Sequence, residues 1–148
     1  MSQQKTLPYA GIRIVEFTHM VMGPTCGMVL GDLGAEVIKV EPIEGDKTRE
    51  LVGSGAGFFP MFNRNKKSIA VDMKSAAGIE LVKKLVATAD VVSENFKPQT
   101  MAKLGLDYET LKKTNQLSLN LPKNGKPFDT YNPKCTILRG LLTKDLMS

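Results

Sequence analysis

The stretch from Gly11 to Glu41 constrains the fold of this chain most, because it predicts a strand, a helix and a second strand in succession. Residues 12–17 form a β-branched and aromatic run of strand length, and residues 35–40 repeat that character. Two such strands with a helix between them predict a right-handed crossover and therefore a parallel sheet. In parallel sheets, ligands bind outside the carboxyl ends of the strands. The loop at 18–23, which follows the first strand, is therefore the first candidate for a binding site.

The segment between these two strands carries signals for the start and the end of a helix. Pro24 is favoured at the first position of a helix, and Gly34 is placed to end it. Three glycines, at positions 23, 27 and 31, lie on one face of this helix. They indicate either close packing of the helix on its sheet or a nucleotide-binding fold. The dinucleotide fingerprint G-x-G-x-x-G is absent, although Glu41 stands near the place of a ribose-binding acid, so an NAD-dependent oxidoreductase is disfavoured.

The strand and helix pattern repeats farther along the chain. A strand at Ser68–Val71 is followed by a helix at Ala76–Ala89, with Ser75 as its N-cap, and by a further strand that begins at Val91. Between the two units, residues 41–60 are rich in glycine and in charge, and they predict a surface excursion with at most a short helix. The fold class is therefore α/β, with a Rossmann-like open, mostly parallel sheet.

The predicted helix at 76–89 is amphipathic. Ile79, Val82 and Val86 lie on one face, which should cover the sheet. Lys83 and its charged neighbours point the other way, towards solvent.

The composition excludes several classes of protein. The chain has 148 residues, of which 42% are hydrophobic and 24% charged, so it has an ordinary globular composition and enough length for one core. Its net charge of +5 is not arranged as basic residues interleaved with aromatic ones, so nucleic-acid binding is not indicated. Cys26 and Cys135 show no metal-ligand spacing and no disulfide framework, and no apolar run reaches membrane-spanning length. We expect a cytoplasmic protein that binds neither nucleic acid nor membrane nor metal.

Four motifs between about residues 7 and 116 carry a resemblance to a known family. They read, in order, VEFTHMVMGPTCGMVLGDLGAEVIKVE, GDKTR, FFPMFNRNKKSIAVDMKS and ADVVSENFKP. In this order they resemble the N-terminal part of the class III coenzyme A transferases of the CaiB/BaiF type. The resemblance implies an incomplete large α/β domain of an enzyme that moves coenzyme A from an acyl-CoA to a carboxylic acid. It further implies a homodimer, acyl-CoA as substrate and no tightly bound cofactor.

The resemblance also implies a coenzyme A site. Its contacts fall on the loop after the first strand, on the turns after two later strands and on one more distant lysine: Val21, Met22, Val71, Asp72, Met73, Lys74, Asn95, Phe96, Lys97 and Lys103. A further family contact, often an arginine after the second strand, is Pro42 here. The diphosphate and the ribose phosphate of coenzyme A need cations and backbone donors. Basic residues in predicted loops or at helix ends suit this role, with a solvated surface charge as the alternative for each: Arg64, Lys66, Lys67, Lys74, Lys97 and Lys103.

No catalytic residue is assigned from the sequence. His19 is the only histidine and lies in the candidate binding loop, but no paired nucleophile accompanies it. In the family, an aspartate nucleophile follows some tens of residues beyond position 116, and neither Asp129 nor Asp145 has its motif context. We therefore expect a chain truncated before the catalytic aspartate and inactive alone. The alternative is a non-catalytic module that binds coenzyme A or a nucleotide.

The sequence divides at about position 116. Residues 1–116 correspond to the N-terminal part of the coenzyme A transferase domain, and residues 117–148 form a divergent tail. Pro122, Pro127 and Pro133 interrupt every periodicity that begins there, so we expect the tail to be irregular. A frameshifted or prematurely ended reading frame and a genuine divergent C-terminus both explain such a tail.

Overall fold

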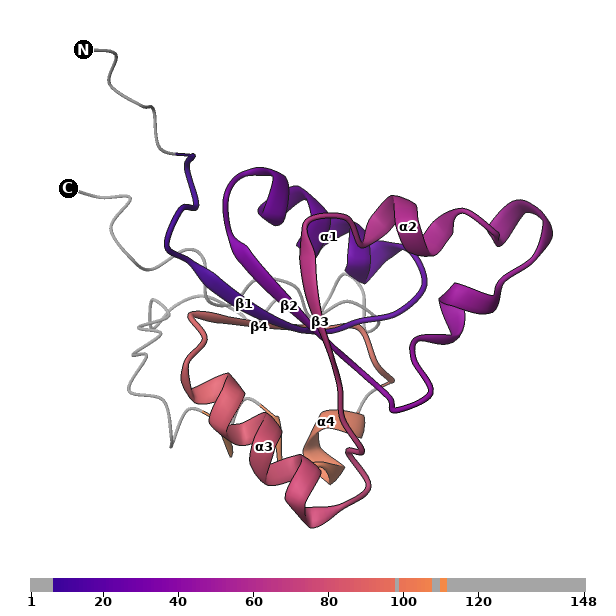
Figure 1. Cartoon of the computed structure of the whole chain (residues 1–148). Helices are drawn as coiled ribbons and strands as arrows, with labels where there is room; N and C mark the ends of the chain where they lie inside the picture. Colours follow the sequence, from indigo (N-terminus) through magenta and orange to yellow (C-terminus); the bar gives the residue numbers. More distant parts are fainter. Residues whose placement is uncertain (1–6, 98, 108–109, 112–148) are drawn as a thin grey trace, which may run out of the picture.

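The computed structural model describes residues 7–97, 99–107 and 110–111, and the statements below refer to that part of the chain. The predicted irregular tail, with Asp129 and Asp145, lies outside these residues. Four parallel strands form one sheet in the order β3-β2-β1-β4 (Figure 1). The strands are β1 (Arg13–Phe17), β2 (Glu36–Glu41), β3 (Lys66–Ala70) and β4 (Val91–Glu94). The open, parallel α/β fold predicted from the sequence is confirmed.

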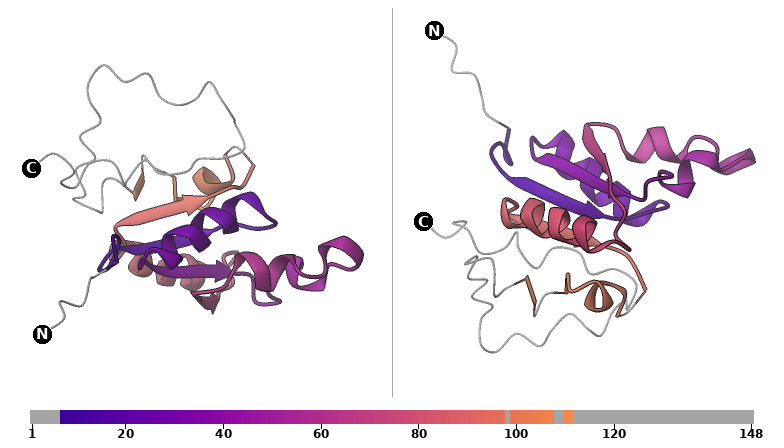
Figure 2. Two further views of the ribbon diagram at one scale, coloured as in Figure 1. Left: turned by 90° about the horizontal axis from the view of Figure 1, so that it is seen from above. Right: turned by 60° about the horizontal axis from the view of Figure 1, so that its bottom comes forward.

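Helices cover both faces of this sheet. Helix α1 (Met22–Asp32) lies on one face, and α3 (Ala76–Ala87) lies on the other (Figures 1 and 2). The short helix α4 (Thr100–Lys103), which the sequence did not predict, lies on the same side as α3 (Figure 1). None of the helices in the described part of the chain is long and apolar enough to cross a membrane.

The excursion between β2 and β3 is more structured than predicted. It holds two short 3₁₀ helices, η1 (Lys47–Glu50) and η2 (Gly53–Gly55), and one α-helical turn, α2 (Phe58–Phe62). The expectation of at most a short helix was therefore wrong. Asp46 accounts for part of the difference, because its carboxylate accepts a hydrogen bond from the backbone N–H of Thr48 and so caps η1.

The helix start at Pro24 was predicted two residues too late. Helix α1 begins at Met22, so Pro24 is its third residue. Proline costs nothing there, because the first four backbone N–H groups of a helix have no partner within the helix. At the other end, Gly34 has a φ of +104° and its N–H donates to the carbonyl of Gly31, so it closes the helix as predicted.

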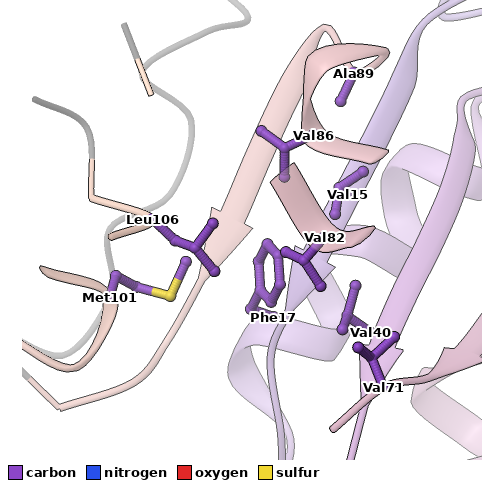
Figure 3. Packing of buried hydrophobic residues seen from close by; sticks show 9 residues of the cluster. All are labelled: Val15, Phe17, Val40, Val71, Val82, Val86, Ala89, Met101 and Leu106. Carbon is purple, nitrogen blue, oxygen red and sulfur yellow. The ribbon is translucent and has the colours of Figure 1, made fainter. Parts of the chain in front are cut away.

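The face of the sheet under α3 carries the larger hydrophobic cluster. Val15, Phe17 and Val40 point towards α3, where they pack against residues that include Val82 and Val86 (Figure 3). Met101 and Leu106 extend the same cluster beyond α3 (Figure 3). The alternation of strand side chains places their sequence neighbours on the opposite face.

The face under α1 changes character along the strands. Near the amino ends it is apolar, because Ile14, Val37 and Val91 pack there with Leu30 of α1. Towards the carboxyl ends, Glu16 and Lys39 take the inward positions, and both are almost completely buried. One face of the sheet therefore carries buried charge close to the edge where ligands bind in such folds.

Two of the three glycines of α1 are required by close packing. A Cβ atom at Gly27 would lie 1.8 Å from Oε2 of Glu16, and one at Gly23 would lie 2.6 Å from Cβ of Thr18. At Gly31 the nearest atom would be 3.5 Å away, which is ordinary contact. The close approach of α1 to its sheet is confirmed at positions 23 and 27, where the helix passes over the carboxyl half of β1.

Candidate functional site

The loops after β1 and β4 form one unit at the carboxyl edge of the sheet. The side-chain amide of Asn95 donates to the carbonyl of His19 (2.9 Å), and the His19 backbone N–H donates to Oδ1 of Asn95 (3.0 Å). The rings of His19 and Phe96 lie 5.7 Å apart between centroids. Of the residues assigned to the site by resemblance, Asn95 and Phe96 thus lie against the loop that leads into Val21 and Met22.

The loop after β1 is also fixed by hydrogen bonds with Lys39 of β2 and Thr48 of η1. The Lys39 ammonium group donates to the carbonyl of Thr18, and the Met20 N–H donates to Oγ1 of Thr48 at 3.1 Å. Met20 has a φ of +65°, a conformation that a non-glycine residue adopts only when its surroundings hold it there. The path of the backbone into Val21 is therefore fixed by residues from β2 and η1.

Four buried charges lie behind that support. Nζ of Lys39 lies 3.0 Å from Oδ2 of Asp46 and 3.9 Å from Oε1 of Glu16, and Nζ of Lys66 lies 2.8 Å from the same Glu16 oxygen. Two ammonium groups and two carboxylates balance within this cluster, which is the condition for burying charge at all. Burial lowers the pKa of Lys66, and the Glu16 carboxylate acts against that shift. Burial alone raises the pKa of Asp46, but hydrogen bonds from Thr48 and the Lys39 ion pair lower it overall.

Glu41, at the end of β2, belongs to a second buried charged group. Its carboxylate accepts two hydrogen bonds from Arg49 (2.9 and 2.8 Å), one from Ser68 (2.6 Å) and one from the Asp46 N–H (2.8 Å). Burial raises the pKa of Glu41, but these donors outweigh it and bring the pKa down to about 2. The Arg49 guanidinium in turn lies 3.7 Å from the ring centroid of Phe59. Because these donors occupy the Glu41 carboxylate, it is not free to bind a ribose, and the NAD hypothesis loses the acid on which it depended.

The turn after β3 is built by its own polar groups. Oδ1 of Asp72 accepts a hydrogen bond from the Lys74 N–H (2.9 Å), and Ser75 caps α3 by accepting one from the Gly78 N–H (3.0 Å). A Cβ atom at Gly78 would lie 2.0 Å from the Asp72 carbonyl oxygen, so this glycine is required there. Val71 is buried in the core, so its own side chain is not available to a ligand. The predicted N-cap at Ser75 is confirmed.

An open pocket of about 600 Å³ lies between this turn, α3 and α4. Three of the site residues implied by the resemblance line it, namely Met73, Lys74 and Lys103. The remaining lining residues are Ser75, Ala76, Ile79, Glu80, Lys83 and Leu104. Met73 and Phe96 both pack against the hydrophobic cluster under α3, so that cluster underlies this pocket as well as the loop pair at β1 and β4.

The structure separates three other basic candidates from this edge. Lys66 and Lys67 lie within β3 and not in a loop, and Arg64 pairs with Asp32 at the end of α1. Lys66 is buried against Glu16, and Lys67 pairs with Glu36 at the start of β2. The expectation that these three lie in loops or at helix ends was therefore wrong for Lys66 and Lys67. Lys97, in contrast, follows β4 at the carboxyl edge and is exposed.

Sequence reasoning missed Lys39, Asp46, Thr48 and Lys83. Lys39 and Thr48 support the candidate binding loop, but they stand 21 and 28 residues away from the groups they contact. The available signal was the charge at Lys39 inside an otherwise apolar strand, which indicates a buried partner. Lys83 is exposed, as its place in the helix predicts, but the sequence did not show that it also lines the pocket.

Known proteins with related sequences give the context for this geometry. The family model for CoA-transferase family III matches residues 9–117. An acyl-CoA transferase of Fusarium pseudograminearum is 43% identical over 89% of this chain and 33% of its own length. A succinate–glutarate CoA-transferase of Agrobacterium fabrum is 46% identical over 73% of this chain and 30% of its own length. This chain thus spans about a third of the length of the curated relatives it matches.

A solved structure of a related protein has the same fold as this chain. The crystal structure of a CaiB/BaiF family protein from Brucella suis superposes with a TM-score of 0.69 and 46% sequence identity. The match covers 75% of this chain and 32% of that protein. Because the family model matches well over half of the sequence, and the fold agrees, the chain belongs to CoA-transferase family III.

Proposed function

We propose that this chain forms the coenzyme A-binding part of a transferase that moves coenzyme A from an acyl-CoA to a carboxylic acid. The observation that carries the proposal is the gathering of the implied contact residues at one edge of the sheet. Met73, Lys74 and Lys103 line one pocket, and Asn95 and Phe96 lie against the loop before Val21. These contacts come from four different segments of the chain, and the parallel topology is what brings them to one edge.

The chemistry of this edge suits the ligand. Lysine side chains supply positive charge for phosphate groups, and the apolar lining residues Met73, Ile79 and Leu104 offer contact area for an uncharged part of the ligand. The side-chain amide of Asn95 is hydrogen-bonded to the His19 backbone, so we assign this side chain the role of fixing the loop. Contact between Asn95 and coenzyme A is then left to its backbone. Val71 contributes through its backbone carbonyl, because its side chain is buried and its N–H is bonded to Glu41.

Isothermal titration of the purified chain with coenzyme A, and separately with NAD, tests the ligand. We expect coenzyme A to bind and NAD to give no response, because the Glu41 carboxylate is occupied by four hydrogen bonds. NAD binding without a response to coenzyme A would overturn the proposal. Coenzyme A binding without any transferase activity, in this chain and in longer versions of it, would favour a non-catalytic binding module.

The proposal extends to the reaction. By resemblance, an aspartate attacks the thioester to form covalent enzyme intermediates, and it lies beyond the residues matched to the family. We therefore expect no transfer by the 148-residue chain alone. Incubation with an acyl-CoA and a panel of carboxylic acids, followed by mass spectrometry of the thioesters, measures this. Sustained turnover that disappears in Asp129→Ala or Asp145→Ala would contradict it.

The partners belong to the same proposal. Relatives of this chain are named for different acids, so the proposed acceptor is a carboxylic acid without further definition. A homodimer, a cytoplasmic location and acyl-CoA as the bound substrate are proposed from the family resemblance. Analytical ultracentrifugation of the chain with and without coenzyme A tests the homodimer.

A further inference from the structure

The pocket between α3 and α4 gathers three unpaired positive charges. It is lined by Lys74, Lys83 and Lys103, which come from the turn after β3, from α3 and from α4. In the described part of the chain, none of these three ammonium groups has a carboxylate oxygen within 4.0 Å. Lys47 and Lys97 also have no such partner in this part of the chain, but they do not line the pocket. The remaining basic side chains in the same part do have one: Arg13, Lys39, Arg49, Arg64, Lys66, Lys67 and Lys84.

The one carboxylate in the pocket lining is already paired. Glu80 lies 2.8 Å from Nζ of Lys84, one turn along α3, and both side chains are well exposed. This ion pair lowers the pKa of Glu80 and raises that of Lys84. The pocket therefore offers three positive charges against one partly neutralised negative charge, which favours an anion with more than one charge.

Lys83 reaches towards α4. A Cβ atom built on Gly105 would lie 3.4 Å from Nζ of Lys83, so the ammonium group rests over the turn that ends α4. That turn follows Lys103 directly, and Gly105 adopts a φ of +63°. The side chain is exposed, as predicted, and lies along the wall of the open pocket.

We propose that Lys83 is a phosphate-binding residue of this chain, acting with Lys74 and Lys103 on one phosphate-bearing part of coenzyme A. The inference rests on the proposed function for the identity of the ligand. It adds a residue that neither the motifs nor the family resemblance assigned. Three lysines from three elements can surround one dianionic or more highly charged group, and each supplies up to three donors.

The experiment compares Lys83→Ala with Lys84→Ala by calorimetric titration of coenzyme A into the full 148-residue chain. Both variants remove one positive charge from adjacent positions of α3, but Lys84 does not line the pocket. Lys84→Ala is a demanding control, because it also leaves the Glu80 carboxylate in the pocket lining without its ion pair. We expect Lys83→Ala to weaken binding about 10-fold, the lower end of the range for one charge-assisted hydrogen bond, because the site is open. Lys84→Ala should change affinity less than about 2-fold, as expected for an exposed ion pair, and Lys83→Arg should retain most of the affinity.

Inorganic pyrophosphate, titrated into the same variants, separates this inference from the proposed function. Coenzyme A binding that is equally strong in Lys83→Ala and Lys84→Ala would overturn the role of Lys83 and leave the proposed function standing. Binding of pyrophosphate that depends on Lys83, with no response to coenzyme A, would keep the anion site and overturn the proposed ligand. Failure of the unmodified chain to bind either compound would overturn both.

Discussion

The two faces of the sheet are built on different principles. Under α3, the strands present Val15, Phe17 and Val40 to a large apolar cluster. Under α1, the same strands present apolar residues near their amino ends, but Glu16 and Lys39 near their carboxyl ends. Adjacent residues of a single strand therefore serve two purposes, because their side chains alternate between the faces.

This difference shows where stability and where positioning come from. On the apolar face, the stabilisation is proportional to the buried apolar area and does not depend on the orientation of the contacting groups. A buried ion pair adds little net stability relative to apolar residues, but its hydrogen bonds have direction. Lys39 uses that direction to hold Thr18, and Asp46 orients Thr48, which holds Met20. We interpret the charged half-face as the support that fixes the candidate binding loop, and the apolar face as the main source of folding energy.

Removing a charge from the buried cluster of Glu16, Lys39, Asp46 and Lys66 should lower the stability of the protein most. Lys39→Met leaves Asp46 and Glu16 with one counter-ion fewer in a buried site, so we expect the free energy of unfolding to fall by about 3 to 5 kcal/mol. Phe17→Leu, at an equally buried position of the apolar face, should cost about 1 to 2 kcal/mol. Urea denaturation followed by circular dichroism measures both. Equal losses in the two variants would show that the charged cluster is not specially sensitive.

Two glycines of α1 allow the same comparison within one helix, because Gly27 lies against the charged residues and Gly31 does not. Gly27→Ala places a methyl group where Oε2 of Glu16 lies, so we expect a loss of about 2 kcal/mol. Gly31→Ala has ordinary contacts and a higher helix propensity, so it should be neutral or stabilise by up to about 1 kcal/mol. The same denaturation experiment compares them. A Gly27→Ala chain as stable as the unmodified protein would mean that α1 is not pressed against the charged residues.

Acid should lower the free energy of unfolding gradually, through protonation of Glu41, and by less than the Lys39→Met substitution. The pKa of Glu41 is about 2 in the folded chain, against an ordinary value of 4.5, so the folded state favours the ionised form. Its contribution is complete above about pH 4.5 and is lost as the pH falls towards 2. In Glu41→Gln, the decline of unfolding free energy over this interval should be shallower by roughly 2 kcal/mol. Parallel acid titrations of the two proteins by circular dichroism would contradict the account if their slopes were the same.

The sequence predicted the fold far better than the site. The strands and the two covering helices follow from local periodicity, and Ser75 and Gly34 act at the helix ends as their residue types indicate. The charged cluster joins positions 16, 39, 46 and 66, which are brought together only by the parallel pairing of β1, β2 and β3. No local pattern encodes those pairings. The periodicity of α3 correctly placed Lys83 on the exposed face of the helix. It carries no information about α4, so it could not show that Lys83 lines the pocket.

The family resemblance extended the prediction to the ligand. It correctly indicated the family and the fold, and it named residues that the topology gathers at one edge. It gave no account of what holds that edge in place. The supporting residues Lys39 and Thr48 came from the structure, because their contacts are with backbone atoms of the loop and not with one another.

The most direct test of the account is a map of coenzyme A contacts on the isotopically labelled chain by amide chemical shifts in solution. We predict that coenzyme A shifts the amides of Val21, Lys74, Asn95 and Lys103, at the carboxyl edge of the sheet and along the pocket. The amides of Asp32, at the end of α1, and Glu36, at the start of β2, should not move. Shifts confined to the amino ends of the strands, or no shifts at saturating coenzyme A, would contradict the claim that the carboxyl edge is a coenzyme A site.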